Sequence, residues 1–391
     1  MSLKLAALAT VAIPGLDVVA TRPPQYASSD YRYGGVLDSH GRHLVVQEPL
    51  HGDADRALRT ERGFLESLDG LSRKDALPFD VIDVIGSTEN EREFEAVVYE
   101  HLSGNELDLD ELRPGPGVTR AVGRAIAAIH ELPFSVVLNC GLPMQEPEAC
   151  RANRLDEVDE AARTGKIPTI LLARWETALD DVSRWKFAPT VVHGDLAPES
   201  VLTGNGQVIS VLNWSNAHIG DPAIDLAWLY TSAPEESLDT IEEAYSIGRH
   251  ERPDPHLIDR ALLYSELAVL RWFLHGVRIG SDEIIDDAQK MLTDLARHVE
   301  HATPRSPEEP DQPSGWDISG SIAADPVAET APMSAPSPSE PLPSPAESLP
   351  SPAMNRSPSA PSAASPSSDS ADASPESPEG PEGASERPVF G

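Results

Sequence analysis

The residue types best suited to chemistry lie in one stretch, residues 191–230. A His-Gly-Asp triplet at 193–195 follows a short apolar run, and a Gly-Asp-Pro triplet at 220–222 precedes a further acid, Asp225. An aspartate held in a loop after a strand can orient or deprotonate a hydroxyl group, and the same residue type can cap a turn. The residue types alone therefore leave two interpretations of Asp195 open.

The elements that must position these acids begin with residues 1–102, which we predict to form a small, mainly antiparallel sheet with one helix. The turn signal at 38–41 separates two strand patterns and indicates a hairpin. The patterns predict strands at 31–37, 43–47, 81–85 and 94–101, and a helix that begins at Asp53 or Asp55 and ends at Leu68. Ahead of them, the Ala-rich run at 3–13 predicts a short helix that leads into a strand, with a secretory signal as the alternative.

Residues 103–303 are predicted to be mostly helical, with a hairpin turn at 203–206. The patterns predict helices at 118–131, 155–162, 171–185, 222–230, 238–248, 255–276 and 282–301, and strands at 191–192, around Val201 and at 208–212. A small antiparallel β lobe followed by a larger helical lobe is a bilobal α+β layout. In such a layout the cleft between the lobes is the default ligand site.

Composition sets the segment 304–391 apart from the rest of the chain. It holds 20 of the 37 prolines and 14 acidic residues against three arginines. Such a segment cannot bury enough apolar surface to offset the entropy of ordering it, so we predict a disordered tail. The tail either solvates the protein or docks a partner that the sequence does not identify.

The remaining composition excludes several classes of protein. A net charge of −34 argues against binding of nucleic-acid backbones. The two cysteines, Cys140 and Cys150, cannot build a disulfide framework or a four-cysteine zinc site. No apolar run is long enough to span a membrane, and we expect a cytoplasmic protein.

The stretch that carries the acids resembles the aminoglycoside and macrolide phosphotransferase family, which is related in fold to protein kinases. The macrolide 2′-phosphotransferase branch is the nearest. The resemblance rests on His-Gly-Asp-Leu at 193–196, Gly-Asp-Pro-Ala-Ile-Asp-Leu-Ala at 220–227 and Ala-Ala-Ile-His at 127–130, and it covers about residues 1–303. It implies a kinase-like fold with a nucleotide lobe before a helical lobe, and transfer of the γ-phosphate of ATP or GTP to a hydroxyl of an antibiotic-like molecule.

The resemblance also implies roles for individual residues. Phosphoryl transfer needs an oriented hydroxyl group and neutralised phosphate charge. Asp195 matches the catalytic aspartate that orients or deprotonates the acceptor, and His193 is expected to hold the loop by hydrogen bonds. Asp225 resembles the buried aspartate that ties down this loop, with a plain first-turn acid as the alternative. Asp221 before Pro222 is expected to be a structural N-cap, and His130 a packed helix-end residue.

Two positions that bind Mg²⁺ in the family carry neutral residues in this chain. Asn213 stands where an aspartate is expected after the hairpin, and Ser200 stands where the family has asparagine or histidine. Mg²⁺ prefers oxygen ligands, and anionic carboxylates contribute most of the binding. An amide and a hydroxyl can touch the ion without neutralising it, so we expect weakened Mg²⁺ binding.

The expected phosphate-binding residues also depart from the family pattern. Gln47 replaces a lysine or arginine that would reach the nucleotide phosphates, while its usual partner, Glu61, is present on the buried stripe of its helix. We expect a nearby arginine to compensate the charge of Glu61. The loop at 27–30 contains no glycine; its backbone around Ser29 can approach a phosphate, but Asp30 would repel it.

Three functions stay open at this point. We favour a weakly active or pseudokinase-like member of the family, because losing one key stabilising group costs about 10²–10³ in rate. The alternatives are an active small-molecule O-phosphotransferase and an interaction protein that acts through its acidic tail. A small molecule in the cleft is the expected ligand; the negative charge suits a cationic amino sugar, but it also suits many other proteins.

Overall fold

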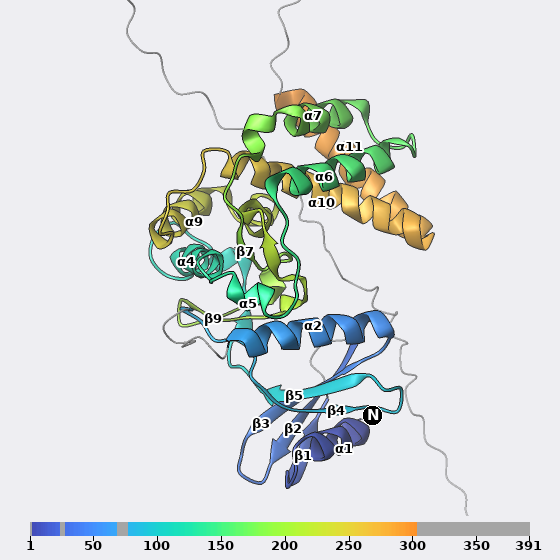
Figure 1. Cartoon of the computed structure of the whole chain (residues 1–391), viewed down its shortest axis with the longest axis vertical. Coiled ribbons are helices and arrows are strands. Elements are labelled where there is room, and N and C mark those ends of the chain that lie inside the picture. Colours follow the sequence, from blue (N-terminus) through green and yellow to red (C-terminus); the bar gives the residue numbers. More distant parts are fainter. Residues whose placement is uncertain (1, 24–27, 69–76, 303–391) are drawn as a thin grey trace, which may run out of the picture. The chain divides into compact units, whose positions relative to one another are not determined.

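The computed structural model describes residues 2–23, 28–68 and 77–302, so the predicted tail at 304–391 and residue 27 of the predicted phosphate loop lie outside the described residues. The amino-terminal part is an antiparallel sheet with the strand order β1-β2-β3-β5-β4 (Figure 1). Its strands are β1 (Val18–Arg22), β2 (Tyr31–Asp38), β3 (His43–Pro49), β4 (Val84–Glu89) and β5 (Glu95–Glu100). The predicted antiparallel sheet is confirmed.

Two helices, α1 (Ser2–Ala12) and α2 (Gly52–Leu68), pack on this sheet. Successive side chains of a strand point to opposite faces, and β5 shows which helix covers which face. Val98 belongs to the apolar cluster of α1, whereas Val97 belongs to the large cluster that includes Phe64 of α2. The two helices therefore cover opposite faces of the sheet.

The structure corrects two predicted boundaries. Helix α2 begins at Gly52, so Asp53 and Asp55 lie in its first turn and neither is the N-cap. The Asp55 carboxylate accepts a hydrogen bond of 2.6 Å from the Glu95 backbone N–H, and this contact holds α2 against β5. The strand predicted at 81–85 begins only at Val84, because the preceding residues leave the sheet and Asp80 pairs with β9 (Gln207–Val211) instead.

The helix predicted at 222–230 is wrong as a continuous helix. The chain forms the 3-10 turn η5 (Pro222–Asp225) and then, after an irregular turn, the short helix α8 (Leu229–Ser232). The carboxylates at both ends of η5, Asp221 and Asp225, bind partners far away in the sequence. These tertiary bonds determine the path of the segment more strongly than its apolar pattern does.

The carboxy-terminal part is helical, as predicted, with two small sheets inserted (Figure 1). Its helices are α4 (Val118–His130), α5 (Ser135–Leu138), α6 (Pro147–Ala162), α7 (Thr169–Asp180), α9 (Glu235–Gly248), α10 (Leu257–Ile279) and α11 (Asp282–Ala302). Its strands are β6 (Asn105–Glu106), β7 (Thr190–Val192), β8 (Val201–Gly204), β9 and β10 (His218–Gly220), which form the sheets β6-β8-β9 and β10-β7. The 3-10 turns that matter for the site are η3 (Pro198–Ser200), η4 (Trp214–Asn216) and η5.

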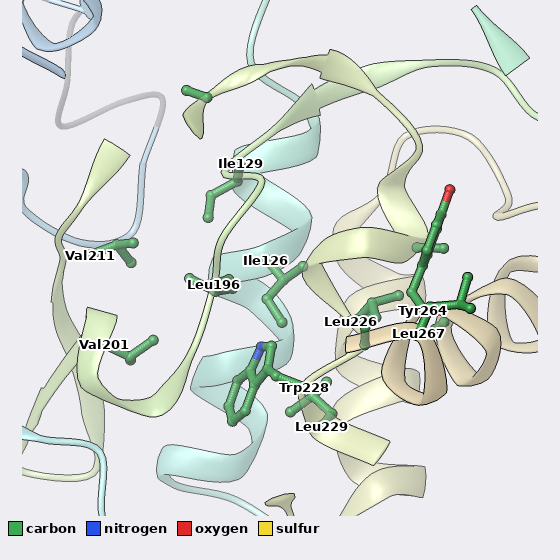
Figure 2. Close-up of a cluster of buried hydrophobic side chains, with 14 of the residues drawn as sticks. Ile126, Ile129, Leu196, Val201, Val211, Leu226, Trp228, Leu229, Tyr264 and Leu267 are labelled. Atoms are coloured by element: carbon green, nitrogen blue, oxygen red, sulfur yellow. The ribbon is translucent and has the colours of Figure 1, made fainter. Parts of the chain in front are cut away.

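One large apolar cluster joins the helices to the loop that follows β7. Figure 2 shows Leu196 of this loop in one cluster of side chains with Ile126 and Ile129 of α4 and with Leu267 of α10. The loop is therefore anchored by its own leucine as well as by hydrogen bonds. Within the described ranges, none of the helices combines the length and the apolar character that crossing a membrane requires.

Candidate active site

The His-Gly-Asp loop follows β7 directly, and its histidine is fully buried. His193 Nε2 lies 2.7 Å from the carbonyl oxygen of Leu212, and its Nδ1 lies 3.3 Å from the backbone nitrogen of Asp195. A carbonyl can only accept and a backbone N–H can only donate, so the ring carries its proton on Nε2. The ring is tilted against Trp214, with centroids 4.8 Å apart. His193 thus joins the loop to the end of β9, and its geometry is that of a holding residue.

Asp225 lies beneath this loop and holds it through the backbone. Its carboxylate accepts hydrogen bonds from the N–H groups of His193 (2.7 Å) and Gly194 (2.8 Å). The side chain has no exposed surface, and His130 Nε2 contacts it at 3.2 Å. Burial alone would raise the pKa of Asp225, but the hydrogen bond and charge of His130 and the bond from the His193 backbone hold it below its usual value.

His130 has more contacts than a packed helix-end residue needs. Its Nδ1 meets the hydroxyl of Tyr245 at 2.9 Å, and that hydroxyl accepts a hydrogen bond of 2.7 Å from Arg249. Burial lowers the pKa of His130, although the neighbouring Asp225 opposes the shift. A buried chain of polar groups therefore runs from the loop to α9. The sequence motif at 127–130 pointed to His130 without showing its partners, because they come from distant segments.

Asp195 is exposed, in contrast to the residues that hold its loop. Among the described residues, Asn216 Nδ2 donates a hydrogen bond of 3.4 Å to Asp195 Oδ2. Gly194, just before it, has φ +83°, and a Cβ there would collide with the carbonyl oxygen of Asn216. The glycine thus lets the loop turn tightly. The Asp195 carboxylate is exposed, so the hydroxyl group of a small molecule can reach it from the solvent side.

Ser200 and Asn213, which we predicted at the metal position, do come together. Asn213 Nδ2 donates to Ser200 Oγ at 3.3 Å. Ser200 ends η3 and is buried, and Asn213 has the left-handed φ of +67° that asparagine and aspartate tolerate better than most residues. An amide hydrogen-bonded to a hydroxyl supplies no negative charge, so these two side chains do not fit the ligand set of a tightly bound Mg²⁺. In the described ranges, no three His, Cys, Asp or Glu side chains gather in a way that could hold a metal ion.

Glu61 of α2 reaches this same turn, although not as predicted. Its Oε1 accepts a hydrogen bond of 3.0 Å from the Trp214 backbone N–H. Burial raises the pKa of Glu61, and the backbone N–H groups of Trp214 and Asn213 only partly oppose the shift. The expected compensating arginine is not found among the described residues. Backbone dipoles take its place, which ties α2 to the start of η4.

Gln47 and Glu61 bind different partners. It faces Tyr33 across the β2–β3 pair, and its Nε2 lies 3.4 Å from the Tyr33 hydroxyl. Among the described residues, no hydrogen bond joins Gln47 to Glu61, the usual partner of the cation that Gln47 replaces. The reason is local: strand register sets the neighbour of Gln47, whereas the phase of α2 turns Glu61 toward η4.

The predicted phosphate loop is described from Ser28 onward. Ser28 Oγ accepts hydrogen bonds from the backbone N–H groups of Asp30 and Tyr31, and the hydroxyl of the exposed Ser29 donates to the Asp30 carboxylate at 3.3 Å. Asp30 in turn meets His51 Nε2 at 2.9 Å. Burial is the largest cause that raises the pKa of Tyr31, and the negative charges of Glu61, Asp30 and Asp55 raise it further. Three acids therefore act on the Tyr31 hydroxyl, and two of them have a basic partner: Asp30 meets His51, and Asp55 pairs with Arg59.

Asp221 is the N-cap that its Asp-Pro pattern predicted, since its carboxylate accepts from the Ala223 N–H at 3.0 Å. It also forms a two-pronged pair with Arg260 of α10, at 2.7 and 3.0 Å, and accepts from the Tyr264 hydroxyl. Asp221 is only 2% exposed, so its oxygens are committed to protein groups. Sequence reasoning missed Arg260, because only the folded chain brings α10 to this turn.

The comparison of the chain with known families agrees with this geometry. The profile of the phosphotransferase enzyme family matches residues 35–260, more than half of the 391 residues, and the match contains both the His-Gly-Asp loop and the turn with Asp225. The chain belongs to the phosphotransferase enzyme family. Its fold is the kinase-like fold of solved macrolide and aminoglycoside phosphotransferases.

The structure is similar to that of macrolide 2′-phosphotransferase MphH from Brachybacterium faecium. The two share 24% identity and a TM-score of 0.64, over 74% of this chain and 97% of that one. A macrolide 2′-phosphotransferase type I is 26% identical, with a TM-score of 0.62 over 74% and 96% of the chains. A GDP complex of aminoglycoside 2′-phosphotransferase-IIIa has 16% identity and a TM-score of 0.61, over 76% and 98%.

One relative comes from the comparison of sequences. The chain is 27% identical over 139 residues to the uncharacterized protein YcbJ of Bacillus subtilis (strain 168). The alignment covers 35% of this chain and 45% of that protein, so the chain spans less than half of the length of this relative.

Proposed function

We propose that this phosphotransferase-family chain is pseudokinase-like: it keeps the acceptor side of the cleft and lacks a tight magnesium–nucleotide site. The observation that carries the proposal is the hydrogen bond between Asn213 and Ser200, which gives the metal position two neutral side chains that bind each other. Phosphoryl transfer depends almost entirely on positioning and charge neutralisation, so a site without these charges transfers phosphate weakly or not at all.

The nucleotide side supports the same conclusion. Gln47 carries no charge and is bonded to Tyr33, while Glu61 is bonded to the backbone of Trp214. The acids around Tyr31 repel phosphate groups. Relatives in this family bind nucleotides, as the GDP complex of the aminoglycoside enzyme shows for that enzyme. We infer that ATP or GTP binds this chain weakly, with little contribution from Mg²⁺.

One observation favours a second function, an active small-molecule O-phosphotransferase. The loop of Asp195 is fully assembled, because Asp225 holds two of its backbone N–H groups and the Asp195 carboxylate is exposed. A chain without selection on chemistry has no need to keep an aspartate oriented in this way. This alternative requires another source of the missing charge.

Turnover measurements separate the two functions. Phosphate release and transfer from ATP and GTP with Mg²⁺ are followed for wild type, Asp195→Ala and the double variant Asn213→Asp/Ser200→Asn. Asparagine is chosen at position 200 because Ser200 is 2% exposed and leaves little space for a larger ring. We expect wild type to match Asp195→Ala and the double variant to exceed both by about tenfold or more. A wild-type rate that Asp195→Ala abolishes contradicts the proposal and supports the active enzyme.

A further inference from the structure

A cavity lies between the second half of α9, the loop that follows this helix and the first turn of α10. Its volume is about 940 Å³, within the range of about 300–1,000 Å³ that is usual for ligand pockets. Its apolar wall consists of Leu226, Pro253, Pro255, Leu257 and Ile258. Leu226 and Leu257 are buried and Pro255 is exposed, so the cavity is open to solvent on one side and apolar at its inner end.

Three charged side chains line this cavity, those of Glu242, Arg252 and Asp254. Both oxygens of Asp254 are paired with Arg260, at 2.9 and 3.0 Å, and Arg252 is exposed, so water solvates its charge. Glu242 is half-buried, and its Oε1 accepts a hydrogen bond of 2.7 Å from the neutral hydroxyl of Tyr230. Within the described ranges, no basic side chain forms an ion pair with Glu242. The Glu242 carboxylate is therefore the charge that a ligand in the cavity can neutralise.

We propose that this cavity binds a small organic amine, whose ammonium group pairs with Glu242 and whose apolar body packs against Leu226 and Leu257. A carboxylate can accept several hydrogen bonds, so Glu242 can bind an ammonium group while it keeps its bond from Tyr230. Ser246 lies four residues after Glu242, on the same face of α9, and its hydroxyl also lines the cavity. An ammonium group has three donors, enough to reach both side chains. This binding function goes beyond phosphate transfer.

Hydrogen bonds connect the wall of this cavity to the loop of Asp195. Tyr245 lines the cavity, and its hydroxyl meets His130 Nδ1 at 2.9 Å. His130 Nε2 contacts the Asp225 carboxylate at 3.2 Å, and that carboxylate accepts from the backbone N–H groups of His193 and Gly194. A ligand that packs against Tyr245 restricts this side chain and, through it, the buried polar groups behind it. We therefore expect the loop to open less often when the cavity is occupied.

Three naphthyl compounds of similar size and different charge test the cavity: naphthylmethylamine, naphthylmethanol and naphthoate. Their dissociation constants with the full chain are measured by ligand-observed NMR, without nucleotide or Mg²⁺, for wild type, Glu242→Gln and Arg252→Gln. Glu243→Gln is the matched control, because Glu243 is the next acid of α9, is exposed and pairs with Arg120. Melting temperatures verify that the variants fold.

We expect naphthylmethylamine to bind wild type at least about fivefold more tightly than the alcohol or the acid. Glu242→Gln is expected to lose this preference, whereas Arg252→Gln and Glu243→Gln are expected to keep it. The proposal is overturned if none of the three compounds binds wild type, if the amine binds no more tightly than the alcohol or the acid, or if folded Glu242→Gln keeps the preference for the amine.

Amide hydrogen exchange tests the connection to the loop. Saturating naphthylmethylamine should slow the exchange of the His193 and Gly194 amides by about threefold or more in wild type. Tyr245→Phe removes the hydroxyl that meets His130, so it should still bind the amine but lose this slowing. If the amine binds wild type and both amides exchange as in the free protein, the connection is refuted. Because nucleotide and Mg²⁺ are left out, none of these outcomes depends on whether the chain transfers phosphate.

Discussion

Replacing Asp225 by alanine should unfold the loop that carries Asp195 and destabilise the whole helical part. The substitution removes the acceptor of three donors: the backbone N–H groups of His193 and Gly194 and the ring of His130. His130, His193 and Asp225 are at most 4% exposed, so water cannot replace the lost acceptor without a rearrangement. The residue therefore acts on stability and on site geometry at once.

The size of the effect follows from these contacts. An unsatisfied buried donor costs about 1–3 kcal/mol, and breaking a buried charged pair costs about 3–5 kcal/mol. Three donors around one buried carboxylate therefore give an expected loss of about 3–5 kcal/mol, after partial relaxation. That is a large part of the stability of about 5–15 kcal/mol that natural domains have.

Chemical denaturation measures this loss, and amide hydrogen exchange locates it. Asp108→Ala is the control, because Asp108 caps the exposed 3-10 turn η1 (Leu109–Glu111) and should cost about 1 kcal/mol or less. Asp225→Ala should also remove the exchange protection of the His193 and Gly194 amides. If Asp225→Ala costs no more than the control and both amides stay protected, Asp225 does not hold the loop.

Two further variants test other contacts. Burial raises the pKa of Glu61, so its contribution to stability is full below about pH 4.5 and is lost as the pH rises through the folded-state pKa. Glu61→Gln keeps an oxygen for the Trp214 N–H but carries no charge. Its free energy of unfolding, measured by denaturation, should therefore exceed that of wild type by more near pH 8 than near pH 5. An equal difference at the two pH values would contradict this reasoning. Gly123→Ala would place a Cβ against the carbonyl of Ile241 and should cost about 1–3 kcal/mol, whereas Gly63→Ala has open space and should stabilise by about 0.5–1 kcal/mol. Equal melting temperatures for the two alanine variants would show that α4 and α9 do not pack as described.

Local patterns were sufficient to predict the fold class. The hairpin of β2 and β3 has a turn signal between two alternating runs, and α4 has a regular apolar stripe, so both were found close to their true bounds. The resemblance to the phosphotransferase family pointed to Ser200 and Asn213, and the structure brings their side chains together.

Local sequence patterns could not predict the contacts between distant segments. The partner of Glu61 is a backbone N–H 153 residues away, and no pattern around Glu61 encodes it. The continuous helix predicted at 222–230 was wrong because the bonds of Asp221 and Asp225 decide the path of the chain.

The Mg²⁺ dependence of nucleotide affinity tests the central claim most directly. Calorimetry compares ATP and GTP binding with and without Mg²⁺ for wild type and for Asn213→Asp. Asparagine has a left-handed φ of +67° at this position, and aspartate tolerates that conformation as well. Asp221 cannot replace the missing carboxylate, since Arg260 and Tyr264 occupy its oxygens. We predict that Mg²⁺ leaves wild-type affinity nearly unchanged and tightens binding to Asn213→Asp by about tenfold or more, about 1.4 kcal/mol. Tightening of that size in wild type would contradict the account.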